Sequence, residues 1–244
     1  MTAYVRRFLA FPAKLLRWLY ARGVTWTFAD CEDDAGEMRA LAEVGANDDL
    51  TPREIGEAAG ITFTRRVASG CDGELDAEEM KVYSHGRGHP STRNYNDAHE
   101  LIHLVRALNL DPFPHDEERV DWGAMALMMP RGLVREVLQR VSLDDPPALI
   151  RAFPGVPPAM VLLRVAWVLR RPVAVHRRGA RWEWVPEGYQ VPERGVWWEQ
   201  RLVRLVKTTM QPEKNLIGAV GVPIGAVGTD GVLVIYPRRG TWGW

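Results

Sequence analysis

The sequence has few of the features that mark secreted, disulfide-rich or membrane-spanning proteins. It contains only two cysteines, Cys31 and Cys71, in 244 residues, and they do not form a CxxC pair. Neither a disulfide framework nor a cysteine zinc site is therefore indicated. No apolar run reaches the roughly eighteen residues that a spanning helix needs, so stable membrane insertion is not expected. These absences favour a globular protein of the reducing cytoplasm.

The chain also has no net charge, because 31 acidic residues balance 31 basic ones. Acidic residues dominate between Ala29 and Gly60, and basic residues dominate between Arg131 and Lys207. A basic segment can face nucleic acid, but a solvated, arginine-rich surface is the favoured interpretation. Direct nucleic-acid binding is therefore a secondary hypothesis.

The N-terminal segment Phe8 to Tyr20 follows Arg6 and Arg7 and has the outline of a signal peptide. Lys14 and Arg17 interrupt its apolar core, which argues against export. A helix that docks on the rest of the protein is favoured over one that lies on a membrane surface.

Two histidines four positions apart are the most informative feature that is present. The run His99-Glu100-Leu101-Ile102-His103 has the HExxH pattern of zinc peptidases. On a helix, His99 and His103 lie on one face, about one turn apart, and can bind the same zinc ion. Glu100 then lies beside the metal, where it can take a proton from a water molecule. Glu100 is the candidate catalytic base.

The flanking residues favour a helix at this position. Asn94 to Asp97 offers good N-cap residues, and an apolar stripe continues to about Leu108. Two prolines, Pro112 and Pro114, then interrupt the helical pattern. A second helix is predicted from Asp116 to Met129.

The second helix can provide a third metal ligand. Glu117 is the first choice, and Asp121 lies one turn later, where it can accept a proton from a ligating imidazole. Glu118 and His115 are alternatives to Glu117. Tyr95 is a candidate donor to the oxyanion of a tetrahedral intermediate. Further candidates for that donor, for which an ordinary surface or hydrogen-bonded role is favoured, are His85, His89 and His176.

The two segments together resemble the ImmA/IrrE-type zinc metallopeptidases. Residues 95 to 103 match an aromatic-x-x-Ala-His-Glu-x-x-His run, and residues 117 to 130 match the helix that follows it in that family. Two positions depart from the pattern: Gly123 stands where the family prefers an aromatic residue, and Val120 where it prefers alanine. The separation of fourteen positions between His103 and Glu117 is short.

The resemblance implies a site and a function. It implies that His99, His103 and Glu117 bind Zn²⁺ and that Glu100 is the catalytic base. It also implies limited proteolysis of a helix-turn-helix transcriptional repressor, in stress response or mobile-element regulation. The alternative is a non-proteolytic transcriptional regulator or protein-binding module whose metal site is structural or vestigial.

The order of the predicted elements indicates an α+β fold with a zincin-like metallopeptidase core, in which a small sheet precedes the metal-binding helix. Two apolar helices around Pro154-Gly155-Val156 have a helix-turn-helix outline, for which packing is favoured over DNA reading. Before the motif, the pattern predicts an acidic helical region from Asp33 to Val44, a helix from Thr51 to Ala59 and strands at 61–64 and 80–84. Beyond Arg171 the pattern becomes β-rich, and the glycine-rich stretch 218–225 is interpreted as turns between short strands. The predicted segments are a helical segment at 1–50, the core at 51–141, the helix-turn-helix-like region at 142–171 and a β-rich C-terminal domain at 172–244.

Overall fold

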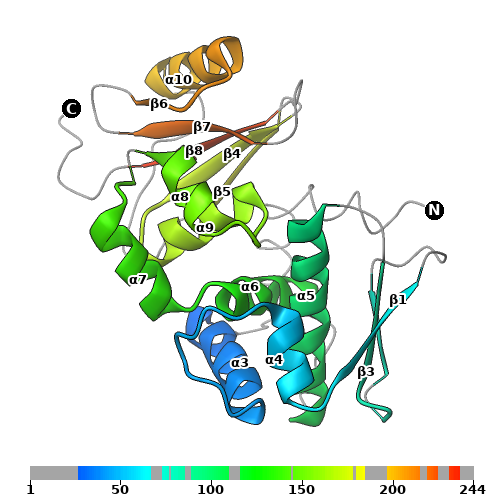
Figure 1. Cartoon of the computed structure of the whole chain (residues 1–244). Helices are drawn as coiled ribbons and strands as arrows, with labels where there is room; N and C mark the ends of the chain where they lie inside the picture. Colours follow the sequence, from blue (N-terminus) through cyan, green and yellow to red (C-terminus); the bar gives the residue numbers. More distant parts are fainter. Residues whose placement is uncertain are drawn as a thin grey trace. The chain divides into compact units, whose positions relative to one another are not determined.

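The computed structural model describes residues 27–66, 73–76, 78–85, 89–109, 116–143, 145–177, 180–184, 197–214, 219–224 and 231–236 (Figure 1). Within these ranges the chain is α+β, with eight helices and eight short strands. It forms two compact units. The first contains the described residues up to 136 together with Phe153–Pro157, and the second contains the other described residues. The predicted N-terminal helix at Phe8 to Tyr20 lies outside the described residues.

Two capped helices open the first unit. Helix α3 spans Phe28–Leu41, and the side chain of Thr27 caps it in a reciprocal capping box with Asp30. The sequence predicted its start near Asp33, because Thr27 was not recognised as a cap. Helix α4 spans Pro52–Ala58 and begins, as predicted, after the cap Thr51 with a proline in its first turn.

A three-stranded sheet follows, with the order β1-β3-β2. Strand β1 (Thr62–Arg66) runs parallel to β3 (Lys81–His85), and β2 (Gly73–Asp76) runs antiparallel to β3. Strands β1 and β3 confirm the two predicted strands. Strand β2 was not predicted, because Gly-Glu-Leu-Asp has low β-propensity and is held by its pairing with β3.

Helix α5 (Pro90–Leu108) and helix α6 (Glu117–Met128) pack against each other and carry the HExxH run and Glu117. Helix α5 begins about one turn before the predicted caps, because His89 Nδ1 accepts the backbone N–H of Ser91 and proline occupies the first turn. Helix α6 begins at the predicted place, where the Asp116 side chain caps it.

Helix α3 holds α6 in place by two charged contacts. The guanidinium of Arg119 on α6 donates to both carboxylate oxygens of Asp34 on α3, at 2.7 and 2.6 Å. The guanidinium of Arg39 on α3 donates to the carbonyl of Leu127 near the other end of α6, at 3.0 Å. The bidentate contact of Arg119 fixes orientation as well as distance, and the hydrogen bond from Arg39 holds the other end of α6.

Three helices follow, α7 (Arg131–Arg140), α8 (Pro146–Ala152) and α9 (Pro158–Val168). The only charged residue of α9, Arg164, is 0% exposed and lies 4.0 Å above the ring of Trp167. Because Arg164 is buried, helix α9 presents no cationic side chain to a DNA groove. The turn before α9 belongs to the first unit, where Asn94 of α5 donates to the carbonyl of Gly155 at 3.2 Å.

The second unit contains an antiparallel five-stranded sheet with the order β5-β4-β8-β7-β6. Helix α10 (Trp197–Thr209) packs against the sheet through Leu202 and Val206. Gly221 in β7 permits this contact, because a Cβ there would lie 2.8 Å from Val206 Cγ2. The segment around Gly221 was predicted as turns and is a strand instead. The strands are β4 (Val173–Arg177), β5 (Ala180–Trp184), β6 (Glu213–Lys214), β7 (Val220–Ile224) and β8 (Gly231–Ile235).

No helix in the described ranges combines the length and the apolar character that crossing a membrane requires.

Candidate metal centre

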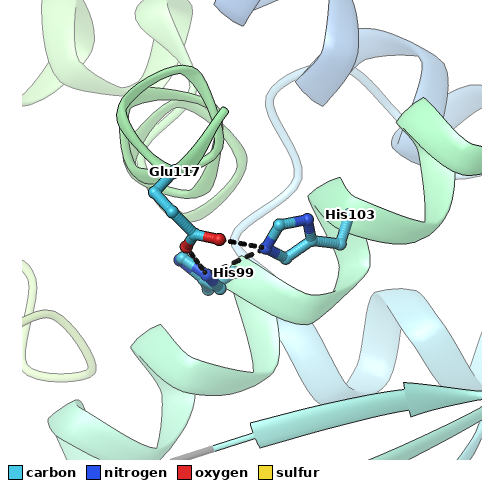
Figure 2. Close-up of side chains that lie close together, drawn as sticks. All are labelled: His99, His103 and Glu117. Atoms are coloured by element: carbon cyan, nitrogen blue, oxygen red, sulfur yellow. Dashed lines mark hydrogen bonds and ion pairs between the residues drawn. The ribbon is translucent and has the colours of Figure 1, made fainter. Parts of the chain in front are cut away.

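Three side chains from α5 and α6 converge on one point, as Figure 2 shows. The Nε2 atoms of His99 and His103 lie 3.2 Å apart. The carboxylate of Glu117 places Oε2 3.2 Å from His99 Nε2 and Oε1 3.7 Å from His103 Nε2. Among the described residues, these three side chains form the only group of at least three His, Cys, Asp or Glu donors close enough to hold a metal ion.

These separations fit a tetrahedral metal ion. Donor atoms that lie about 2.0–2.1 Å from a tetrahedral zinc are about 3.3 Å from one another. The Nε2–Nε2 distance of 3.2 Å lies close to that value, and the two carboxylate oxygens of Glu117 lie 3.2 Å from His99 Nε2 and 3.7 Å from His103 Nε2. Two imidazoles and one carboxylate also form a donor set that leaves a fourth coordination position open. The His-His-Glu group can therefore hold a divalent metal ion.

The group formed by His99, His103 and Glu117 is partly exposed to solvent. The side chains of His99 and His103 are 15% and 13% exposed, and that of Glu117 is 35% exposed. A structural zinc site is normally closed by four protein ligands, whereas a catalytic site keeps a position for water or substrate. Because it is partly exposed, a small molecule or a chain segment can reach the group.

The imidazole of His99 is oriented from behind by Asp121 of α6. Its Nδ1 lies 2.9 Å from Asp121 Oδ1, which leaves Nε2 directed at the metal group. Burial lowers the pKa of His99, but the hydrogen bonds with Asp121 and Glu117 outweigh it and raise this pKa to about 10. Two carboxylates thus stabilise a positive charge at this position.

Among the described residues, Glu117 is the third member of the group, and the alternative Glu118 is not. Burial raises the pKa of Glu117, but hydrogen bonds from His103 and His99 outweigh it, so that the carboxyl titrates well below its ordinary range. Glu118 is 3% exposed, and burial with the nearby Asp116 and Asp121 raises its pKa to about 8. His115 lies outside the described residues.

Glu100 is placed directly after the first histidine on the same helix. Only 9% of its surface is exposed. Burial raises its pKa, and the nearby His99 and His103 oppose that rise in part. A buried glutamate with a raised pKa accepts a proton more readily than an exposed one, as a general base requires.

Tyr95, the candidate donor to a substrate oxyanion, contacts a buried carboxylate. Its hydroxyl donates to Asp121 Oδ1 at 2.6 Å, and the residue is only 3% exposed. The oxyanion role therefore gains no support. Of the other candidates for that role, His89 caps α5 and His176 contacts Glu199 in the second unit; the side chain of His85 lies outside the described residues.

One pair of residues near the site was missed by sequence reasoning. Asp97 of α5 is 0% exposed and receives two hydrogen bonds from the guanidinium of Arg65 on β1, at 2.8 and 2.7 Å. This pair fixes the sheet to the helix two residues before His99. An aspartate in an otherwise apolar helical stripe was the available signal, but its partner lies 32 positions away in the sequence.

The fold and the site together define an α+β protein with a His-His-Glu group that can hold a metal ion. No protein-family model and no curated protein sequence matches the chain. A solved structure named as a Mycobacterium tuberculosis transcriptional regulator is similar in fold, with a TM-score of 0.57 and 16% sequence identity. The match covers 91% of this chain and 92% of that one, so the likeness extends over both units.

Proposed function

We propose that this protein is a zinc-dependent endopeptidase of the ImmA/IrrE type with a zincin-like core. The observation that carries the proposal is the convergence of His99, His103 and Glu117 beside Glu100. Zinc is the proposed metal because two imidazoles and one carboxylate suit it. When bound, zinc supplies a Lewis acid that lowers the pKa of a water molecule towards neutrality.

Each residue has a defined role in the proposed reaction. His99, His103 and Glu117 would hold the metal through the two Nε2 atoms and the carboxylate. Asp121 keeps the ring of His99 in the required orientation. Glu100 takes a proton from the water that attacks the peptide carbonyl and then delivers it to the departing amine. The same carboxyl therefore serves as base and then as acid.

The proposed substrate is a helix-turn-helix transcriptional repressor, cut at a limited number of bonds in the cytoplasm. This substrate follows from the resemblance in residues 95–103 and 117–130. The fold neighbour named as a transcriptional regulator supports a place for this chain in the control of transcription. The raised pKa of the buried Glu100 supports general-base chemistry at this site.

A second candidate function is a transcriptional regulator that does not cut proteins. The name of the fold neighbour favours it. The burial of Arg164, the one charged residue of α9, speaks against DNA reading by that helix. DNA binding that weakens steeply as salt rises, without any need for zinc, would support the second candidate.

The test is co-expression of the protein with the helix-turn-helix repressors of its own genome, followed by mass spectrometry of new protein termini. Wild type is expected to produce a defined cut in one repressor. Glu100→Gln is expected to retain about one zinc per chain and to reduce cleavage by about 100-fold or more. Cleavage that continues unchanged in Glu100→Gln would refute the proposed mechanism.

A further inference from the structure

Tyr95, Asp121 and His99 form a hydrogen-bonded chain that joins the two helices of the metal centre. Tyr95 and His99 lie one turn apart on α5, and Asp121 lies on α6. The Tyr95 hydroxyl donates to Asp121 Oδ1 at 2.6 Å, and His99 Nδ1 lies 2.9 Å from the same oxygen. One carboxylate oxygen of α6 is therefore held between two side chains of α5.

Burial makes the hydrogen-bonded arrangement of Tyr95, Asp121 and His99 rigid. Tyr95 is 3% exposed and Asp121 is 9% exposed, so water competes little for either hydrogen bond. Burial, with the Asp121 charge next, raises the pKa of Tyr95 well above its ordinary value. The phenol therefore stays protonated and remains a donor over the whole neutral range.

The two contacts also fix the orientation of the Asp121 carboxylate. Because both groups meet at Oδ1, rotation of the carboxylate about its Cβ–Cγ bond would break both contacts together. The contact from Asp121 to His99 Nδ1 sets which imidazole nitrogen faces Glu117. Asp121 and Glu117 are also one turn apart on α6, so the same clamp fixes the distance between α6 and α5 at the third ligand.

We infer that Tyr95 is a positioning residue of the metal centre, which acts through Asp121 on His99 and does not touch the substrate. This inference rests on the proposed metal function of His99, His103 and Glu117. It gives the tyrosine hydroxyl a task that a phenylalanine of the same shape cannot perform. The ring fills the core in either case, whereas only the hydroxyl holds the carboxylate.

The test compares Tyr95→Phe with a matched variant in the other unit, Tyr236→Phe. The Tyr236 hydroxyl also donates at 2.6 Å to a buried carboxylate, that of Glu199. Both variants remove one such hydrogen bond, so both are expected to lower the unfolding temperature to a similar extent. Only Tyr95→Phe is expected to change the metal centre.

The measurements are the zinc dissociation constant, from competition with a chelator, and the visible absorption spectrum of the Co²⁺-substituted protein. Tyr95→Phe is expected to weaken zinc binding about threefold to tenfold, less than the roughly 10- to 100-fold expected for loss of the carboxylate in Asp121→Asn. Its Co²⁺ spectrum is expected to shift, while that of Tyr236→Phe matches wild type.

Two results would overturn the inference in distinguishable ways. Zinc affinity and a Co²⁺ spectrum of Tyr95→Phe equal to those of wild type would refute the role of Tyr95 and leave the metal centre intact. A wild-type protein that binds neither Zn²⁺ nor Co²⁺ would refute both the positioning role and the proposed function.

Discussion

A buried carboxylate lies between a tyrosine and a histidine in each of the two units, but within the described residues only the cluster of the first unit adjoins a group that can hold a metal ion. In the second unit, Glu199 of α10 is 1% exposed. It lies 2.5 Å from His176 Nε2 on β4 and accepts the Tyr236 hydroxyl at 2.6 Å. The partners are of the same kinds as those around Asp121, but His176 and Tyr236 contact different oxygens of Glu199, whereas Tyr95 and His99 share Oδ1 of Asp121.

The difference lies in what the other histidine nitrogen faces. In the first unit, the second nitrogen of His99 lies 3.2 Å from both Glu117 and His103. His176 joins no group of three or more possible metal ligands within the described residues. A tyrosine-carboxylate-histidine contact therefore orients an imidazole, whereas only the convergence of further donors forms a group that can hold a metal ion.

Removing one carboxylate from each unit gives the largest expected contrast. Glu117→Ala is expected to reduce zinc from about one ion per chain to none, because two protein ligands do not retain the metal. Glu199→Ala is expected to keep the zinc and to lower the free energy of unfolding by about 1–3 kcal/mol, since its two partners lose a buried acceptor. Elemental mass spectrometry and urea unfolding measure these effects. Equal zinc content in both variants would remove the contrast.

Glu118 of the first unit is expected to make stability depend on pH, because its Oε2 is buried with no hydrogen-bond partner in the described structure. Its pKa rises from 4.5 to about 8 on folding, mainly through burial. As pH rises, the unfolded chain therefore loses this proton at a lower pH than the folded protein does. This group's contribution therefore lowers stability progressively between about pH 4.5 and pH 8, by at most about 4–5 kcal/mol, and is constant above that window.

The variant Glu118→Gln is expected to lack this contribution and to be more stable than wild type near pH 8. Urea unfolding with a chelator present, at several pH values across the window, measures the difference between the two proteins. Other titrating groups affect both proteins alike, so the difference isolates Glu118. Parallel stability curves for the two proteins would contradict the prediction.

Glycines at close packing contacts give the smallest expected effects and distinguish the units again. A Cβ at Gly123 would lie 2.9 Å from Ile102 Cγ2, where α6 meets α5, and one at Gly221 would lie 2.8 Å from Val206 Cγ2 in the second unit. Alanine at either position is expected to cost about 1–3 kcal/mol through overpacking. Only Gly123→Ala is expected to weaken zinc binding as well, because it separates the two helices that carry the ligands.

Gly36→Ala is the control for the glycine variants. This glycine lies within α3, and a Cβ there would meet no atom within 4 Å. Alanine is expected to stabilise the helix by about 0.5–1 kcal/mol, with unchanged zinc affinity. Thermal unfolding and chelator competition on the three variants test the set. Tighter zinc binding in Gly123→Ala would show that the close contact does not position the ligands.

Local signals in the sequence were sufficient where neighbouring residues decide the structure. Thr51 and Pro52 define the start of α4, and the apolar periodicity around His99 defines α5. Local signals failed where a distant partner supplies the stability. Strand β2 depends on its pairing with β3, and the strand at Gly221 depends on pairing with β8 and on α10 above it.

The structure also gives a reason for glycine at position 123, where ImmA/IrrE-type sequences prefer an aromatic residue. The sequence shows only that a small residue stands where an aromatic is preferred. The packing shows that Ile102 of α5 occupies the space next to Gly123, so that the helices approach closely without a large side chain from α6. The reason for a small residue at position 123 is therefore its contact with Ile102, 21 positions away in the sequence.

The sequence by itself determined that His99 and His103 share one helix face with Glu100 beside them, because the helical repeat of about 3.6 residues fixes that relation. Only the tertiary structure decided that Glu117, not Glu118, meets the histidines. Neighbouring residues on a helix point about 100° apart, and the packing of α6 against α5 and α3 selects which of them faces the site. The partner of Tyr95 was decided in the same way, since a hydrogen bond across 26 positions depends on where the chain returns.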